Sequence, residues 1–240
     1  MRGVTASRTD RSRGDEDQTR LLALSDGLFA IVLTLLVLDL HQSDTTLTYE
    51  ELVQLWPRLF GFFLTFFVGG SYWVAHHKDF EYIDGHNETL LWLNLMFLLS
   101  VSLLPFTTAV IGEHTSTVAW TLYALNIIGI GLSLAAIWGY ADSVGMIEER
   151  MNSDARRIAT VRHFVIPSVF VISIPFAFFT NIAPYTPLLI PVATRIFTRV
   201  VGDVPTPGQP ARHLRWLALG YVPLIAFVVW SIWLSLRGQI

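Results

Sequence analysis

One segment near the amino terminus, residues 20–40, most restricts what this chain can fold into. It reads RLLALSDGLFAIVLTLLVLDL, and as a helix with about 1.5 Å of rise per residue it spans roughly 30 Å, the thickness of a membrane core. It nevertheless holds Ser25 and Asp26 one third of the way along, with Arg20 at its entrance. A carboxylate inside a bilayer costs about 2.5–3.5 kcal/mol on insertion scales, so Asp26 marks a partner or a function.

A helical projection of this segment places an apolar stripe and the carboxylate on different faces. With Ile31 as the reference, Thr34, Leu35 and Leu38 lie within about 60° of it, whereas Asp26 lies about 140° away. The stripe and the carboxylate therefore face different environments. One of them looks into the protein, and the other looks toward lipid, a neighbouring subunit or a pore.

The polar and apolar residues of this segment also form a recognisable pattern, made of Arg20, Ser25, Asp26, Ile31, Thr34, Leu35 and Leu36. It resembles the first-helix signature of the transmembrane protein 175 family of potassium channels in its prokaryotic six-helix form. The signature has Phe where this chain has Leu24, which keeps the apolar bulk and loses an aromatic ring. The resemblance continues through Trp73, His76, His77 and Asp79 and through residues 93–106, and so covers about the first half of the chain.

The resemblance implies a potassium-favouring cation channel, a homotetramer in which the first helix of each chain lines a central pore. Its constriction would be formed by Ile31, Leu35 and Leu38, with Thr34 beside them. From spacing alone, such a row is typical of a lipid-facing or packed surface. A pore of this kind gates by wetting and dewetting, and the Thr34 hydroxyl offers partial ion solvation. Because the chain has no Thr-Val-Gly-Tyr-Gly carbonyl filter, we expect modest potassium selectivity.

The remaining sequence predicts an all-α integral membrane protein, because 52% of the residues are hydrophobic and only 15% are charged. A polar cytoplasmic tail, residues 1–19, precedes a single, non-duplicated channel domain, residues 20–240. We expect a kink at Pro105, and a loop with a short interfacial helix at residues 185–197. Six spans are predicted, at residues 21–40, 57–77, 89–111, 116–140, 163–183 and 215–236.

Six spans place both termini on one side, and the basic residues indicate which side. Eleven Lys and Arg residues fall on the amino-terminal side, and five, including Arg195 and Arg199, on the other. The sequence therefore predicts a multi-pass protein of the cell membrane with both termini cytoplasmic. If residues 185–197 crossed the bilayer, the carboxyl terminus would lie outside. The net charge of -3 and the absence of a basic run give no reason to expect a nucleic-acid partner.

Several polar residues of the first three spans fall at one depth: Arg20, Ser25, Asp26, Trp73, His77 and Asn94. We predict that they form a buried hydrogen-bonded hub in which Arg20 balances the Asp26 carboxylate. Two interpretations remain open. The hub either fixes the rotation of the first helix and responds to pH through His77, or simply holds the helices together.

Two other classes of protein share some of these features. The segment from His76 to His86 is rich in metal-ligand residue types, as are the histidine boxes of membrane di-iron enzymes. Those sites need about eight histidines, whereas this chain has seven, of which His41, His114 and His213 are predicted on the opposite side. We therefore expect no enzyme, no metal and no cofactor. A secondary transporter would suit the intramembrane Asp/His cluster, but the sequence shows neither an internal repeat nor a midplane charged pair.

Overall fold

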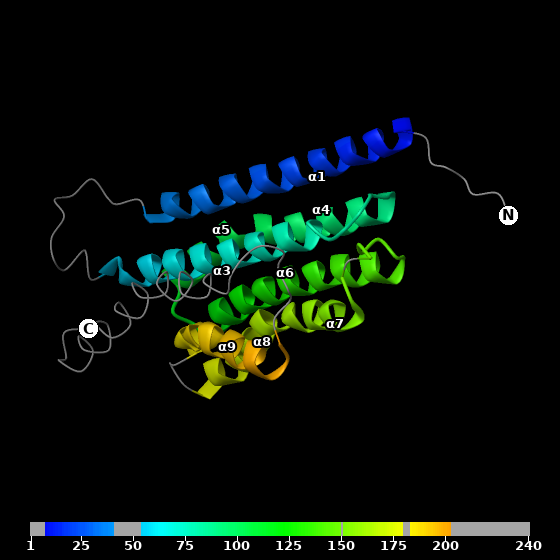
Figure 1. Ribbon diagram of the computed structural model, residues 1–240. Helices are drawn as coiled ribbons and strands as arrows, with labels where there is room; N and C mark the ends of the chain where they lie inside the picture. Colours follow the sequence, from blue (N-terminus) through cyan, green and yellow to red (C-terminus); the bar gives the residue numbers. More distant parts are fainter. Residues whose placement is uncertain (1–7, 41–53, 150, 180–182, 203–240) are drawn as a thin grey trace.

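A computed structural model describes residues 8–40, 54–149, 151–179 and 183–202, and every element in these ranges is a helix (Figure 1). The chain is therefore all-α within its described part. The elements are α1 (Arg8–Leu35), η1 (Leu36–Leu40), α3 (Trp56–Phe80), α4 (Glu88–Ser102), α5 (Leu104–Glu113), α6 (Thr117–Ser143), α7 (Ser153–Arg162), α8 (Val165–Phe179), η2 (Ala183–Leu189) and α9 (Ile190–Val200).

Five helical segments are long and apolar enough to cross a membrane, which agrees with a multi-pass membrane protein. They are Gln18–Leu38, Trp56–Phe80, Glu88–Glu113, Thr117–Ser143 and Ser153–Phe179. The first four lie within about three residues of the predicted spans at both ends. The fifth starts earlier than predicted because α7, which carries charged residues, leads into α8. The predicted sixth span, residues 215–236, lies outside the described residues.

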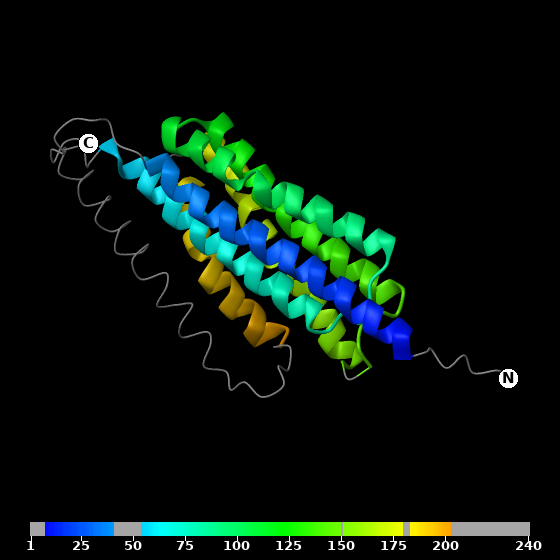
Figure 2. The same cartoon turned by 90° about the horizontal axis from the view of Figure 1, so that it is seen from above.

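The amino-terminal helix is longer than the sequence predicts. It begins at Arg8, inside the segment that we expected to be a polar tail. Arg, Glu and Gln residues have good helix propensity, and residues 8–19 contain no proline to break the helix. We call the end of the bundle where α1 begins, near Gln18 and Phe80, the amino-terminal end (Figure 2).

Polar side chains and one proline set the other helix boundaries. Asn87, Ser116 and Asn152 each cap a helix by accepting a hydrogen bond from the backbone N–H three residues later, at 2.9, 3.2 and 2.8 Å. The predicted third span breaks into α4 and α5 at Leu103, next to the first turn that contains Pro105. A proline has no N–H to continue the helical ladder, which accounts for the break.

The core of the bundle is centred on α6, which packs against α4, α5 and α8. Its buried face carries Trp120, Tyr123, Ile127, Ile130, Leu134 and Trp138, none of them more than 4% exposed. Gly131 allows close packing there, because a Cβ at this position would overlap the Pro167 ring of α8 and lie 2.8 Å from the Tyr72 hydroxyl of α3. The tight contact between α6 and its neighbours fixes the scaffold against which α1 lies.

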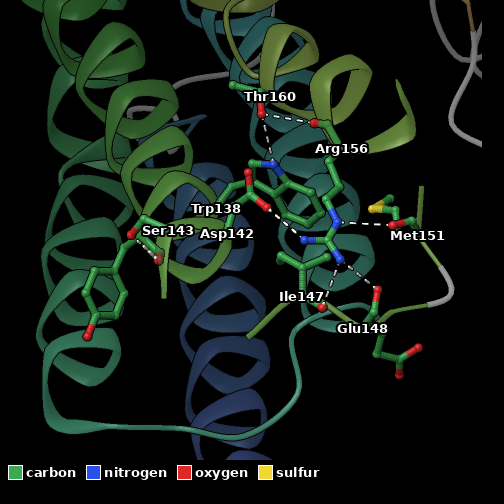
Figure 3. A network of polar contacts seen from close by, with 9 residues as sticks. Trp138, Asp142, Ser143, Ile147, Glu148, Met151, Arg156 and Thr160 are labelled. Carbon is green, nitrogen blue, oxygen red and sulfur yellow. Dashed lines mark hydrogen bonds and ion pairs between the residues drawn. The ribbon is translucent and has the colours of Figure 1, made fainter. Parts of the chain in front are cut away.

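A single arginine organises the loop between α6 and α7 at the amino-terminal end (Figure 3). The Arg156 guanidinium donates to the backbone carbonyls of Met151, Ile147 and Glu148 at 3.1, 3.3 and 3.4 Å. It also pairs with the Asp142 carboxylate at 3.3 Å. These bonds satisfy carbonyl groups that no helix would otherwise satisfy, so they hold the loop in one conformation.

The segment after α8 departs from the sequence expectation. Residues 185–197 were expected to be a loop with an interfacial helix on the side opposite Lys78. Instead, they form most of η2 and α9, and α9 runs back toward the amino-terminal end (Figure 2). Arg195 and Arg199 thus line the same cavity as Lys78. The expectation that placed these two arginines on the side opposite Lys78 is wrong. Helix α8 runs away from the amino-terminal end, and α9 then returns toward that end with its apolar face packed against α8.

Candidate functional site

The first helix divides into a packed face and an exposed face. Leu21, Ser25, Phe29, Val32 and Leu36 are at most 5% exposed and pack against α3, α4 and α5. The predicted stripe lies on the other side, where Ile31, Leu35 and Leu38 are 61%, 42% and 65% exposed. Figure 1 shows α1 at the edge of the bundle, which leaves the stripe uncovered within one chain.

Thr34 is the polar residue of this exposed face. Its hydroxyl lies 3.0 Å from the Ala30 carbonyl oxygen and 2.8 Å from that of Ile31, and donates to this pair. Because its one proton is used within the helix, the oxygen presents only lone pairs to the exterior, as a cation ligand must. After Leu35 the chain tightens into the 3₁₀ helix η1. Side chains three residues apart eclipse in such a helix, which aligns Leu38 with Leu35.

A buried chain of hydrogen bonds joins α1 to α4 and α3. Asn94 donates through Nδ2 to the Ser25 hydroxyl at 3.1 Å and accepts from His76 Nε2 at 2.9 Å. Ser25 in turn donates to the Leu21 carbonyl at 3.0 Å. All three polar side chains are at most 1% exposed, and the His76 ring stacks on Phe97 at 5.0 Å. The bonds run in one direction, from His76 through Asn94 and Ser25 to the Leu21 carbonyl, so they link α3, α4 and α1 in series.

A second polar group lies on the outer surface between α1 and α3. The Trp73 indole donates to the Asp26 carboxylate at 2.8 Å. The His77 ring stacks on Trp73 at 5.8 Å, and its Nε2 lies 3.7 Å from Glu81. Asp26 is exposed in the single chain, as Trp73 and His77 largely are. This surface group and the buried chain contact α1 at neighbouring residues but from two sides.

The six predicted hub residues are thus divided rather than gathered. Ser25 and Asn94 lie in the buried chain, and Asp26, Trp73 and His77 in the surface group. Arg20 is exposed on α1. The histidine bonded to Asn94 is His76, which the sequence analysis left out of the hub. Helical spacing gave no signal for this choice, because His76 and His77 follow Trp73 by three and four residues and both spacings fall on one helix face.

The structure also reveals a buried ion cluster that the sequence analysis did not predict. Asp79, 1% exposed, accepts from His163 Nε2 at 2.6 Å and from the Arg162 guanidinium at 3.1 Å. It joins the end of α3 to the junction of α7 and α8. Asp79 follows His76 by three residues and so shares its buried face, a spacing that could have indicated burial.

Comparison with known proteins decides the family. A sequence profile described as "Endosomal/lysosomal potassium channel TMEM175" matches residues 20–105. The chain is 32% identical over 152 residues to "Potassium channel B446_29190" of Streptomyces collinus, an alignment that covers 60% of this chain and 74% of the relative. The chain belongs to the TMEM175 family. It is a prokaryotic-type member, as the signature at Arg20–Leu36 predicts.

Further relatives show how much of the TMEM175 family this chain resembles. It is 37% identical over 118 residues to "Potassium channel HX13_20290" of a Chryseobacterium species, covering 49% of this chain and 59% of the relative. It is 26% identical to the human "Endosomal/lysosomal proton channel TMEM175", of which the alignment covers 32%. The crystal structure of a TMEM175 homologue from Chamaesiphon minutus superposes with a TM-score of 0.63 at 22% identity, over 76% of this chain and 98% of the other. That likeness supports the shared fold.

Membership of the TMEM175 family also bears on the two other classes of protein considered above, a histidine-box metal enzyme and a secondary transporter. The proteins of this family are channels, which are not enzymes, so the prediction that this chain is no enzyme is confirmed. The described residues contain no group of three or more His, Asp or Glu side chains that could hold a metal ion. No comparison supports a secondary transporter or a histidine-box enzyme.

Proposed function

We propose that this chain is a potassium-favouring cation channel whose pore is surrounded by the α1 helices of four copies. The main observation in support is the exposed stripe of Ile31, Leu35 and Leu38, with Thr34 beside it, on a helix whose opposite face is packed. In this arrangement the stripe forms a hydrophobic constriction that opens by wetting and closes by dewetting. Related bacterial proteins named as potassium channels support potassium as the conducted ion.

The polar contacts of α1 support this orientation of the helix. Asn94 of α4 holds Ser25 from one side, and Trp73 of α3 holds Asp26 from another. A rotation of α1 by one residue, about 100°, would break both bonds and bury part of the stripe. The two contacts therefore act as positioning groups that keep the stripe directed away from the rest of the chain.

Small residues beside the stripe support close approach of a second copy. Ala23, Gly27 and Ala30 are exposed, and a Cβ at Gly27 would meet nothing within 4 Å inside the chain. Small side chains at such spacings let membrane helices pack closely. Four α1 helices meeting along this surface enclose a narrow apolar path, in which the lone pairs of Thr34 replace part of the hydration of the ion.

The proposed setting is the cell membrane, with the amino terminus in the cytoplasm and potassium, lipid and copies of the same chain as partners. The proposed channel has no backbone-carbonyl filter, so discrimination between potassium and sodium rests on the width of the constriction and on Thr34. We therefore expect a modest preference for potassium. A strongly potassium-selective reversal potential would contradict that mechanism.

Ion flux through proteoliposomes tests the proposal. The wild-type chain is compared with Leu35→Ala for potassium, sodium and a large organic cation, each driven by its own gradient. We expect passive potassium flux in the wild type. Removing the Leu35 side chain widens an apolar constriction, so the variant should conduct faster and discriminate less between ions.

A matched control separates pore lining from general damage. Leu125→Ala removes the same atoms from α6, where Leu125 is 55% exposed and lies away from the stripe. This control should conduct like the wild type. Unchanged flux and selectivity in Leu35→Ala would remove Leu35 from the pore, and no passive flux in correctly assembled wild-type protein would refute the channel itself.

A further inference from the structure

A cavity of about 510 Å³ opens between α3, α7, α8 and α9, away from the exposed stripe of α1. This volume is typical of sites that bind small molecules. Most of its wall is apolar, and α9, which lies at the edge of the bundle in Figure 2, forms one side of it. The apolar part of the wall includes Tyr72, Ala75, Leu134, Ile166, Ile190 and Phe197.

The rest of the wall is strongly basic. Lys78, Arg162, Arg195 and Arg199 line the cavity, and no described carboxylate lines it with them. Arg162 is paired with the buried Asp79 at 3.1 Å. The other three cations form no ion pair with another described residue within 4.0 Å. The cavity therefore holds an excess of positive charge that its own wall does not neutralise.

On α3 and α9 the cations of the cavity lie toward the amino-terminal end of the bundle. On α3 the wall runs from Ser71 to Lys78, about 10 Å by helical rise, with the cation at the amino-terminal end. On α9 the order is the same, since Ile190 is buried and Arg195 and Arg199 follow about one and a half and two and a half turns later toward that end. A ligand that fits this order is negative at one end and apolar at the other.

We propose that this cavity binds an anionic phospholipid, with its phosphate among Lys78, Arg162, Arg195 and Arg199 and an acyl chain along the apolar wall. Basic pockets between membrane helices bind anionic headgroups in this manner. A zwitterionic lipid would add a cationic choline or amine to a site that already has excess positive charge. A soluble anion would leave the apolar part of the cavity without a partner.

Native mass spectrometry of the full chain in neutral detergent tests the proposal, with phosphatidylglycerol and phosphatidylcholine added at equal concentration. We expect the wild type to bind phosphatidylglycerol at about one site per chain in preference to phosphatidylcholine. A basic residue near the membrane surface strengthens anionic binding about fivefold. The Arg195→Gln/Arg199→Gln variant should therefore bind phosphatidylglycerol about thirtyfold more weakly.

Two further variants make the result specific to the cavity. Arg58→Gln/Arg157→Gln removes the same charge at residues that do not line it, and should bind like the wild type. Ala75→Trp fills the apolar part without changing the charge, and should also weaken binding.

Equal losses in both charge variants would show diffuse surface attraction and overturn the proposal. Unchanged binding in Ala75→Trp would overturn it too, since the lipid would then lie outside the cavity. Equal binding of both lipids would have the same meaning, as would the absence of any bound lipid. The elution volume in size-exclusion chromatography and the helical content identify any variant that fails to fold. If either Ala75→Trp or Arg195→Gln/Arg199→Gln fails to fold, the remaining one of the two provides the test.

Discussion

Two adjacent histidines give the sharpest test of how α1 is held. His76 is buried, donates to Asn94 at 2.9 Å and stacks on Phe97. His77 is half exposed, stacks on Trp73 and lies 3.7 Å from a carboxylate. Truncation of each to alanine should therefore have very different consequences for stability, although the two residues are neighbours and chemically identical.

The expected magnitudes follow from these contacts. His76→Ala leaves a cavity the size of an imidazole ring and an unsatisfied Asn94 carbonyl. Together these should lower the free energy of unfolding by about 3 kcal/mol. For a chain of this length, that corresponds to a fall of about 6–12 °C in melting temperature. His77→Ala removes a half-exposed stack on Trp73 and a 3.7 Å approach to Glu81, so it should cost less than about 1 kcal/mol.

Thermal unfolding in detergent, followed by tryptophan fluorescence, measures both changes on the same preparation. His76→Gln serves as a partial rescue, because its amide can again donate to Asn94 although the stacking on Phe97 is lost. It should melt between the wild type and His76→Ala. A fall for His77→Ala as large as that for His76→Ala would refute the separation of the two polar groups.

Two further substitutions test the scaffold. Asp79→Ala leaves the buried His163 and its neighbouring guanidinium without their carboxylate, and should lower the unfolding free energy by about 3 kcal/mol in the same melting assay; no loss would contradict the buried cluster. Gly131→Ala places a methyl group against the Pro167 ring and should cost about 1–3 kcal/mol. Gly139→Ala, in the same helix with nothing within 4 Å of its new methyl group, should be neutral or slightly stabilising, and equal effects of the two alanines would refute the close contact.

The sequence predicted the features that depend on local composition. Runs of uncharged residues predicted four long apolar helices nearly to their ends, and the helical period put Ile31, Leu35 and Leu38 on one face of α1. The break beside Pro105 follows from a missing N–H, which is also a local property. These features need no knowledge of which helices are neighbours.

The features that the sequence did not predict depend on contacts between distant helices. The choice of His76 over His77 is made by Asn94 and Phe97, which belong to α4. Asp79 is buried because His163 and Arg162, more than eighty residues away, supply its partners. The return of α9 depends in the same way on the surface that α8 presents. Periodicity alone contains no information on these pairings.

The polar contacts of α1 with the rest of the described chain lie between Gln18 and Asp26, and this has a mechanical consequence. Beyond Asp26, the only polar side chain up to Leu38 is Thr34, which bonds to its own helix. The outer half of α1 is thus held by apolar packing alone, so a tilt of this half about Ser25 breaks no side-chain hydrogen bond to another helix. Leu38 lies about 20 Å along this lever arm. A tilt of about 5° moves its side chain by about 1.7 Å, so a small rotation near Ser25 becomes a displacement comparable to an atomic radius at the far end.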